Sequence, residues 1–211
     1  MKTNLRLIGG KRIQSPNNIF TRPTTLRVRE AIFNILNYKV KNSNWLDLFS
    51  GTGSISCEAY NHGARKIIAI EKNKINSRIC LKNLLSLQDI ENRKNDFEVI
   101  CKDVLSWTKP NYERSLSTKI MELDKLKFDF VYLDPPYDVN FHELVLNQIF
   151  NCNFLKKDSI VICEHSPNLI INKSTLWQTI DVRDYGQSRL TFLINVQHAL
   201  TSSVLIPCTY E

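Results

Sequence analysis

The sequence lacks any apolar run that approaches the roughly 20 residues of a membrane span, so we expect no transmembrane helix. Its first ten residues, MKTNLRLIGG, have a basic start but no apolar segment of the kind found in signal peptides, which predicts a cytoplasmic protein. A Cys-x-x-Cys pair is missing as well. The six cysteines are scattered, mostly inside apolar segments, and we interpret them as reduced core residues rather than disulfide partners or metal ligands.

Acidic residues are absent before Glu30. The basic residues of the segment 1–29 equal the whole formal excess of +7, which leaves 21 basic against 21 acidic residues in the remainder. A neutral body with a basic N-terminal arm suggests a polyanionic partner, although a solvated tail would have the same composition. The two strand-like runs around Gly9-Gly10 in LRLIGGKRI favour an ordered hairpin with a two-residue turn.

From residue 24 onward, helical patterns alternate with short apolar segments. We predict helices at 24–38, 54–63, 73–87 and 141–150, the first of them N-capped by Thr24 or Thr25. Strands are predicted at 45–49, 66–71, 97–103, 128–134, 159–165, 176–185 and 188–196. Such alternation is typical of an α/β fold with a mainly parallel, doubly wound sheet, and the last two strands, around Gly186, would add an antiparallel hairpin. Residues 108–126 are polar and predict a surface excursion.

A glycine-rich loop, LDLFSGTGS at 46–54, follows the first predicted strand, at the end where parallel sheets bind ligands. Gly51 and Gly53 permit tight turning and close approach of the backbone to a ligand. A dinucleotide loop has a third glycine three residues further on, where this chain has Ser56, so a nicotinamide oxidoreductase is disfavoured. Asp47, inside the strand, suits a cationic ligand group; a tight turn with a capping aspartate is the alternative.

Two more acidic residues close predicted strands. Glu71 lies about 20 residues after the glycines, where a carboxylate can accept hydrogen bonds from both hydroxyls of a ribose. Asp103 closes the third strand, where it can accept from the amino group of an adenine. Either residue alone could be a solvent-facing strand end, but three acidic strand ends predict one ligand cleft.

The segment FDFVYLDPPY, 128–137, ends a fourth strand on Asp134 and two prolines. Pro135 and Pro136 cannot continue a central strand, so they force the backbone out of the sheet and leave no N–H donors at its rim. The Asp134 carboxylate, the Pro135 carbonyl and the ring of Tyr137 then form a rigid set of two acceptors and a stacking surface. This set fits a planar base that donates from an exocyclic amine and has left its stack. A plain Pro-Pro turn is the alternative.

Two further segments, LIGGKR and TRPTTLRVREAIFNIL, precede these motifs. In the order and spacing of all of them, the chain resembles the RsmD family of bacterial 16S ribosomal RNA guanine-N2 methyltransferases over roughly residues 4–195. The resemblance implies a Rossmann-like class I methyltransferase fold with a seven-stranded, mainly parallel sheet, a C-terminal antiparallel hairpin and a small basic N-terminal β-hairpin. We expect the N-terminal hairpin or arm at 1–23, the methyltransferase domain at 24–196 and a tail at 197–211. Family members often have another Arg-Gly pair after Gly-Gly-Lys, where IQSPNN stands here, so the grip of this hairpin on RNA is expected to be weaker.

The resemblance also implies S-adenosylmethionine as cofactor and the N2 amine of a guanine, at position 966 of 16S ribosomal RNA, as the methylated group. The partner would be the small ribosomal subunit or its assembly intermediate, met by a monomer. We expect catalysis by Asp134, Pro135, Pro136 and Tyr137. Cofactor binding is expected from Asp47, Phe49, Gly51, Gly53, Glu71, Lys72, Asp103 and Val104. Contacts to RNA, or bracing of the active-site loops, are expected from Lys11, Arg12, Arg22, Thr24, Arg27 and Arg29.

Two other functions stay open at this point. An adenine-N6 methyltransferase could use the same Asp-Pro-Pro-Tyr segment, although a separate target-recognition region is not evident in the sequence. A methyltransferase-like fold could also serve only as an RNA-binding assembly factor, against which the intact Asp134, Tyr137 and glycine loop argue.

Overall fold

The computed structural model describes residues 5–15, 24–88, 96–109, 126–136, 141–152, 154–171 and 174–196. The chain forms two compact units, which divide between Trp107 and Thr108. Most of the predicted surface excursion at 108–126 lies outside the described residues, as do Arg22, Tyr137 and the predicted tail. The predicted bounds 1–23, 24–196 and 197–211 therefore stay predictions.

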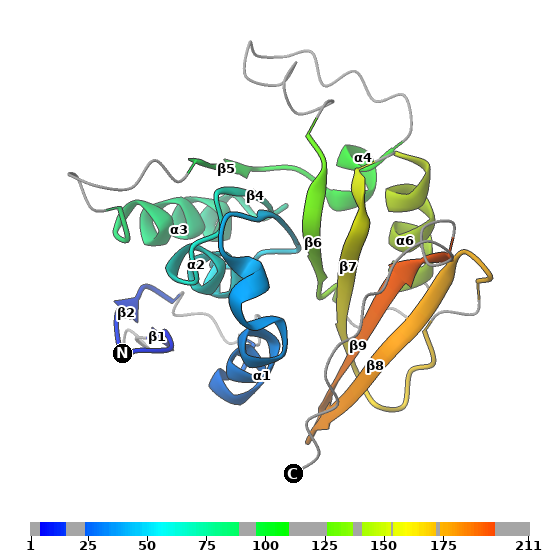
Figure 1. Cartoon of the computed structure of the whole chain (residues 1–211). Coiled ribbons are helices and arrows are strands. Elements are labelled where there is room, and N and C mark those ends of the chain that lie inside the picture. The colour runs from blue at the N-terminus through cyan, green and yellow to red at the C-terminus, as the bar shows by residue number, and fades with distance from the viewer. Residues whose placement is uncertain are drawn as a thin grey trace. The chain divides into compact units, whose positions relative to one another are not determined.

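The first unit is built on three parallel strands, with β4 between β3 and β5 (Figure 1). The pairing runs from Asn44↔Lys66 to Leu48↔Ile70 and from Lys66↔Asp96 to Ile70↔Ile100. All five residues of β3 are buried, as in parallel strands that are covered on both faces. The elements are α1 (Leu26–Leu36), η1 (Asn37–Val40), β3 (Asn44–Leu48), α2 (Ser54–Asn61), β4 (Lys66–Ile70), α3 (Lys74–Leu85), β5 (Asp96–Ile100) and α4 (Val104–Trp107).

The helices α1 and α3 begin at residues whose side chains cap the first turn. Thr25 caps α1, where its hydroxyl oxygen accepts a hydrogen bond from the Val28 amide at 3.3 Å, so the second of the two predicted caps is confirmed. Asn73 caps α3, and its side-chain oxygen accepts from two amides of the first turn at 2.9 and 3.1 Å. The short helix α4 was not predicted, since four residues carry too little periodicity to be recognised.

The predicted N-terminal hairpin is present within residues 5–15. β1 (Leu5–Arg6) pairs antiparallel with β2 (Arg12–Ile13), and the hairpin lies beside α2 and α3 (Figure 1). The prediction of a two-residue turn was wrong. The amide of Leu7 donates to the carbonyl of Lys11, and Gly10 donates to Leu7, so the strands are joined by the longer loop 7–11. Leu7 is only 2% exposed, and burying this side chain holds the longer loop against the unit.

The second unit has four strands in the order β6-β7-β9-β8 and one helix (Figure 1). β7 is parallel to β6, whereas β9 runs antiparallel to both β7 and β8. Tyr185 pairs with Ser188 across Gly186, which has φ +65°, so the predicted C-terminal hairpin is confirmed. The elements are β6 (Phe128–Leu133), α6 (Phe141–Asn151), β7 (Leu155–His165), β8 (Trp177–Tyr185) and β9 (Ser188–Asn195).

The described elements confirm the predicted α/β class. Most strand pairs are parallel, and the last two strands of the chain, β8 and β9, form an antiparallel hairpin. Among the described helices, none has both the length and the apolarity to cross a bilayer. Five described cysteines are free thiols. Cys57, Cys80 and Cys163 are buried as predicted, but Cys101 is exposed because β5 ends one residue earlier, at Ile100.

Candidate active site

The glycine loop after β3 has three residues in the left-handed region of backbone conformation: Phe49 at φ +63°, Gly51 at φ +54° and Gly53 at φ +79°. Such a conformation is unusual for an aromatic residue, and strained residues of this kind cluster at ligand-binding sites. A side chain at Gly51 would meet open space, so the backbone there is accessible to a ligand. The loop thus has the form that was predicted for a ligand-binding turn.

The second glycine has a packing role. A Cβ atom at Gly53 would lie 2.5 Å from the Cys80 sulfur, so only glycine lets α3 approach the start of α2 this closely. Asn83, also on α3, donates to the carbonyl oxygen of Thr52 at 2.9 Å. The loop is therefore fixed from the side of α3 as well as by its own turn.

Asp47 lies in β3 with an exposed fraction of 0%. Its Oδ2 atom accepts hydrogen bonds from the amide of Ser56, at 3.1 Å, and from the Ser56 hydroxyl. Burial raises the pKa of this carboxyl to about 7, although the two hydrogen bonds from Ser56 lower it. Through these two hydrogen bonds the side chain braces the first turn of α2, and its predicted role toward a cationic ligand group stays a prediction. Its Oδ1 atom is buried and has no hydrogen-bond partner among the described residues.

Glu71 and Asp103 follow β4 and β5, the strands next to β3 in chain order, and both are half-buried. Glu71 accepts from the Gly51 amide through Oε2 at 2.9 Å and from the Asn73 amide through Oε1 at 2.6 Å. Asp103 caps α4 by accepting from Ser106 at 3.1 Å, and it forms an ion pair with Lys72 at 3.4 Å. The structure thus joins the predicted residues Gly51 and Glu71, and also Lys72 and Asp103. Val104 is the buried first residue of α4.

In the second unit, pairing of β6 with β7 ends at Leu133↔Cys163, one residue before Asp134. The chain leaves the sheet at the two prolines, as predicted from their missing N–H groups. Asp134 is half-buried, Pro135 is buried and Pro136 is exposed. This arrangement leaves the Asp134 side chain at the carboxyl end of β6 and partly accessible to solvent.

A buried polar cluster at the same end of the β6–β7 pair was not predicted. The Glu164 carboxylate accepts from the hydroxyls of Tyr132 and Ser188, the latter at 2.8 Å, and its backbone carbonyl accepts from His142 at 3.0 Å. His165 contacts the Thr191 hydroxyl at 2.9 Å. Glu164 is the last residue but one of the predicted strand 159–165, so a search for acidic residues near strand ends, like the one that found Glu71 and Asp103, could have identified it.

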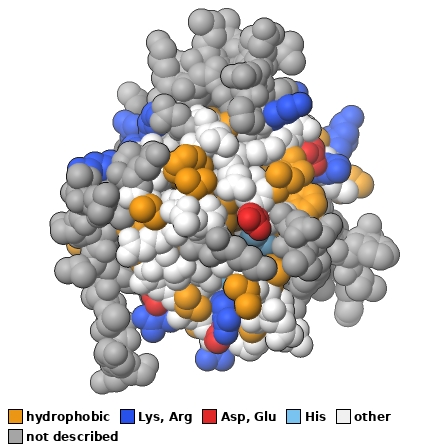
Figure 2. All heavy atoms as spheres, turned by 90° about the vertical axis from the view of Figure 1, so that its right-hand side faces the viewer, with side chains coloured by type: hydrophobic (Ala, Val, Ile, Leu, Met, Phe, Trp, Pro, Cys, Tyr) orange, Lys and Arg blue, Asp and Glu red, His pale blue; other side chains and the backbone are white. Residues whose placement is uncertain are grey.

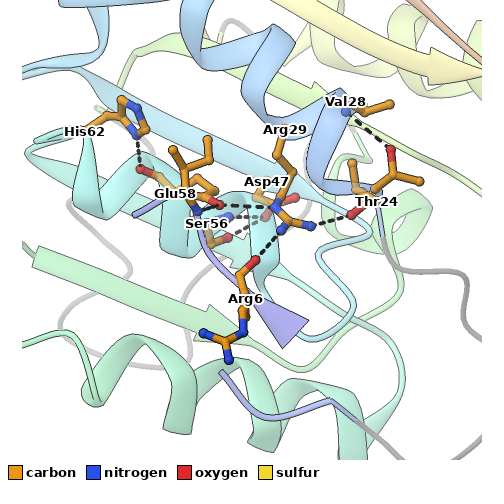
Figure 3. A network of polar contacts seen from close by, with 10 residues as sticks. Arg6, Thr24, Val28, Arg29, Asp47, Ser56, Glu58 and His62 are labelled. Carbon is orange, nitrogen blue, oxygen red and sulfur yellow. Dashed lines mark hydrogen bonds and ion pairs between the residues drawn. The ribbon is translucent and has the colours of Figure 1, made fainter. Parts of the chain in front are cut away.

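Arg29 corrects the predicted set of RNA contacts. Its guanidinium is 0% exposed and donates to the Glu58 carboxylate at 3.1 Å, to the Thr24 carbonyl and to the Arg6 carbonyl (Figure 3). Glu58 also accepts from the Ile8 amide at 2.8 Å. Arg29 cannot reach RNA from this position. It braces the structure, but what it ties to α1 and α2 is the N-terminal hairpin and not the active-site loops, as had been predicted.

The other predicted RNA contacts differ in exposure. Lys11, Arg12 and Arg27 are exposed, whereas Thr24 is 8% exposed and accepts from Arg29 through its carbonyl. In the second unit, the exposed end of the C-terminal hairpin is different: Arg189 forms two hydrogen bonds with the Asp184 carboxylate, at 2.6 and 2.9 Å.

Comparison with known proteins adds to this geometry. The family model Conserved hypothetical protein 95 matches residues 5–194. Ribosomal RNA small subunit methyltransferase D of Buchnera aphidicola subsp. Baizongia pistaciae is 31% identical over 173 residues, which cover 79% of each protein.

Two solved structures share the fold. The Escherichia coli protein yhhF has a TM-score of 0.72 at 23% identity, covering 90% of this chain and 97% of its own. The T. thermophilus 16S rRNA N2 G1207 methyltransferase (RsmC), in complex with AdoMet and guanosine, has a TM-score of 0.60 at 16% identity, covering 91% of this chain and 49% of its own. From the family match over residues 5–194 and the Buchnera relative, the chain belongs to the Conserved hypothetical protein 95 family, the RsmD-like methyltransferase family that its motifs resemble.

Proposed function

We propose that this protein transfers a methyl group from S-adenosylmethionine to the exocyclic N2 amine of a guanine in 16S ribosomal RNA. We rest this above all on Asp134, a half-buried carboxylate at the point where β6 leaves the sheet through two prolines, in a chain of this family. The substrate would be the small ribosomal subunit or its assembly intermediate, as the name of the Buchnera relative suggests.

The first unit offers a fit to S-adenosylmethionine. Asp47 Oδ1 is buried without a donor among the described residues, and Gly51 leaves open space beside its Cα. Glu71 and Asp103 accept hydrogen bonds from the protein, but each carboxylate oxygen has two lone pairs, so both can still accept from ribose and adenine. When bound, S-adenosylmethionine supplies a methyl group that is activated by a positively charged sulfur.

Asp134 would hold the amine that receives this methyl group. Its carboxylate and the Pro135 carbonyl accept the two amine protons, which fixes the direction of the nitrogen lone pair. Because the nitrogen becomes positively charged as the new bond forms, the Asp134 carboxylate stabilises that charge and accepts a proton directly or through water. Tyr137, outside the described residues, keeps the stacking role that was predicted from the sequence.

Guanine is favoured over adenine by the family resemblance of the N-terminal segment TRPTTLRVREAIFNIL, most of which forms α1. The T. thermophilus neighbour is named as a guanine-N2 methyltransferase, and it supports the proposal that this fold can present that amine for methylation. An adenine-N6 methyltransferase remains the second candidate, because the Asp-Pro-Pro-Tyr segment alone accepts either exocyclic amine.

The substrate can be tested by methyl transfer from labelled S-adenosylmethionine to isolated small subunits and to protein-free 16S RNA, followed by nucleoside analysis. We expect N2-methylguanosine at one position. Detection of N6-methyladenosine would show that the substrate is adenine and not guanine. RNA binding without any methyl transfer would favour the assembly-factor function.

Asp134→Ala tests the catalytic role. We expect turnover to fall at least 100-fold, as for the loss of a group that acts in the transition state, with S-adenosylmethionine affinity within a few-fold of wild type. Asp158→Ala is a matched control, since Asp158 is an exposed aspartate of the same unit on β7. Undiminished turnover in the Asp134 variant would refute the assignment.

A further inference from the structure

A row of basic side chains follows the outer face of α3. Lys74, Arg78 and Lys82 are four residues apart, so they lie on one side of the helix with successive charges about 6 Å apart along its axis. All three are exposed. Within the residues that the structure describes, none of the three forms an ion pair. We call these residues the α3 row.

The opposite face of α3 is buried against the first unit, so the helix is firmly packed. Cys80 lies against Gly53, and Asn83 donates to Thr52 of the glycine loop. Both residues are buried. The helix is thus fixed in orientation, and its basic side faces solvent.

The N-terminal hairpin extends the α3 row. Ser86, at the C-terminal end of α3, is the next position in the same series of four, and its carbonyl oxygen accepts from the Lys11 ammonium at 2.7 Å. Gln14 and Asn83 exchange two further hydrogen bonds, at 2.8 and 2.9 Å, between the segment after β2 and α3. Lys11 therefore stands at the end of the row, and Arg12, the exposed first residue of β2, follows it in the chain.

The helix dipole favours Lys82, in the last turn of α3, but folding does not favour the rest of this distribution of charge. Like charges four residues apart repel each other and destabilise a helix. Lys74 also stands in the first turn of α3, where the helix dipole disfavours a cation, and that turn contains no acidic residue. Neither α3 nor the segment 5–15 contains an aspartate or a glutamate. A polyanion that lies along the row would remove this repulsion.

We infer that the α3 row and the hairpin residues Lys11 and Arg12 form one surface for the phosphate backbone of the RNA substrate. The row starts three residues after Glu71, at the carboxyl end of β4, and reaches the hairpin about 18 Å further on, given 1.5 Å of rise per residue. RNA bound there stays within one helix length of the strand end that is proposed to bind the cofactor. This inference rests on the proposed function for the identity of the polyanion as RNA.

The triple variant Lys74→Gln/Arg78→Gln/Lys82→Gln tests this surface, because glutamine keeps the helix propensity and removes only the charge. A matched control, Lys39→Gln/Lys41→Gln/Lys157→Gln, removes the same charge from residues near the amino ends of β3 and β7. Binding to small subunits and to protein-free 16S RNA is measured over a series of KCl concentrations, with the thermal unfolding midpoint as a check of folding.

For the triple variant we expect an affinity loss of about tenfold at 100 mM KCl, and a salt dependence that is flatter by about two units, since each lost phosphate contact removes about 0.7–0.9. The KM for RNA should rise by the same factor at unchanged kcat, and S-adenosylmethionine affinity should not change. The control should behave as wild type.

Two results would overturn the inference: a slope and affinity equal to wild type in the triple variant, or an equal loss in the control, which would show an effect of net charge only. A failure of the proposed function looks different, because the wild-type protein would then transfer no methyl group to either RNA substrate. Wild-type methyl transfer combined with unaltered RNA binding by the triple variant would reject the surface alone.

Discussion

The two β-hairpins of this protein have the same secondary structure and are held in different ways. β8 and β9 pair at eight positions, and β9 also pairs with β7 and is almost wholly buried. β1 and β2 pair at two positions only. The N-terminal hairpin is instead fixed by side chains of the helices beside it, above all Arg29, Glu58 and Asn83. A long ladder stabilises itself, whereas a short one depends on external donors and acceptors.

The charges of the two hairpins differ as well. In the C-terminal hairpin, Arg183 and Arg189 form ion pairs with Asp181 and Asp184, at 3.0 and 2.6 Å. On the face of the molecule in Figure 2, where the right-hand side of Figure 1 is turned to the viewer, acidic and basic side chains are interspersed. The N-terminal hairpin has basic residues and no acidic one. Charges that are compensated internally serve the fold, whereas uncompensated charges of one sign are available to an external polyanion.

The largest expected effect comes from breaking the anchor of the N-terminal hairpin. Arg29→Met leaves the Glu58 carboxylate buried without its cation, although burial already raises the pKa of Glu58 above its ordinary value. We expect unfolding in urea to show a loss of about 3–5 kcal/mol, with faster amide exchange of residues 5–13. The double variant Arg29→Met/Glu58→Gln should recover at least half of this loss, because glutamine is uncharged and still accepts from the Ile8 amide. A loss below about 1 kcal/mol would show that the anchor is dispensable.

Arg29 also shows where sequence reasoning ends. Strand ends, helix spacing, the Thr25 cap and the exit of the chain at Asp134 follow from local patterns, and the structure agrees with them within a few residues. The burial of Arg29 depends on Glu58, 29 residues further along the chain. Arginines are mostly exposed unless they are paired, so an arginine whose partner is not known is predicted to be exposed. No local pattern specifies that partner.

The same limit applies to the candidate site. An acidic residue at a strand end predicts the place of Asp47, Glu71 and Asp103, but only tertiary packing decides which carboxylate faces outward. Asp47 turned out to be buried because β3 is covered on both faces, so neither side of the strand is open. The Gly53–Cys80 contact could not be predicted either, because it depends on how closely α3 approaches α2.

Acid should affect the two units in opposite directions. Burial lowers the pKa of His142, which supports the Glu164 cluster under β9, from 6.5 to about 4, so its contribution to stability is full above pH 6.5 and is lost as the pH falls toward 4. Burial raises the pKa of Asp47 from 3.8 to about 7. The charged Asp47 carboxylate therefore destabilises the fold fully above pH 7, and this destabilisation disappears as the pH falls toward 4.

Amide exchange measured at pH 7 and pH 4.5, corrected for intrinsic rates, can detect this difference. We expect the second unit to lose about 2–3 kcal/mol of local stability at pH 4.5, while β3 and α2 gain stability. His142→Gln, which keeps a donor for the Glu164 carbonyl, should reduce the acid loss, and Asp47→Asn should reduce the gain; burial of His165 and Glu58 accounts for the part that stays. Equal responses of the two units would contradict the assignment of these groups.

A smaller effect is expected at the junction between the N-terminal hairpin and α3. Asn83→Ala removes one donor to Gln14, one donor to Thr52 and one acceptor for the Gln14 amide. We expect a loss of about 1–2 kcal/mol in urea unfolding, together with faster exchange of the Gln14 amide. Ser86→Ala is the control, since its hydroxyl is exposed and donates, among the described residues, to the nearby Asn83 carbonyl alone, so its loss should matter little.

The smallest expected effect is that of one arginine in each hairpin on the salt dependence of RNA binding, and it tests the difference in charge between the two hairpins directly. Arg12 and Arg189 are each in one of the two hairpins, but only Arg189 has an acidic partner within the described residues. Arg12→Gln should flatten the salt dependence of RNA binding by about 0.7–0.9 units, the value of one phosphate contact. Arg189→Gln should leave the slope, the affinity and the unfolding midpoint unchanged, because its charge is already compensated by Asp184 on the surface. If both variants changed the slope alike, the C-terminal hairpin would bind RNA as well, and internal pairing of charge would not distinguish the two hairpins.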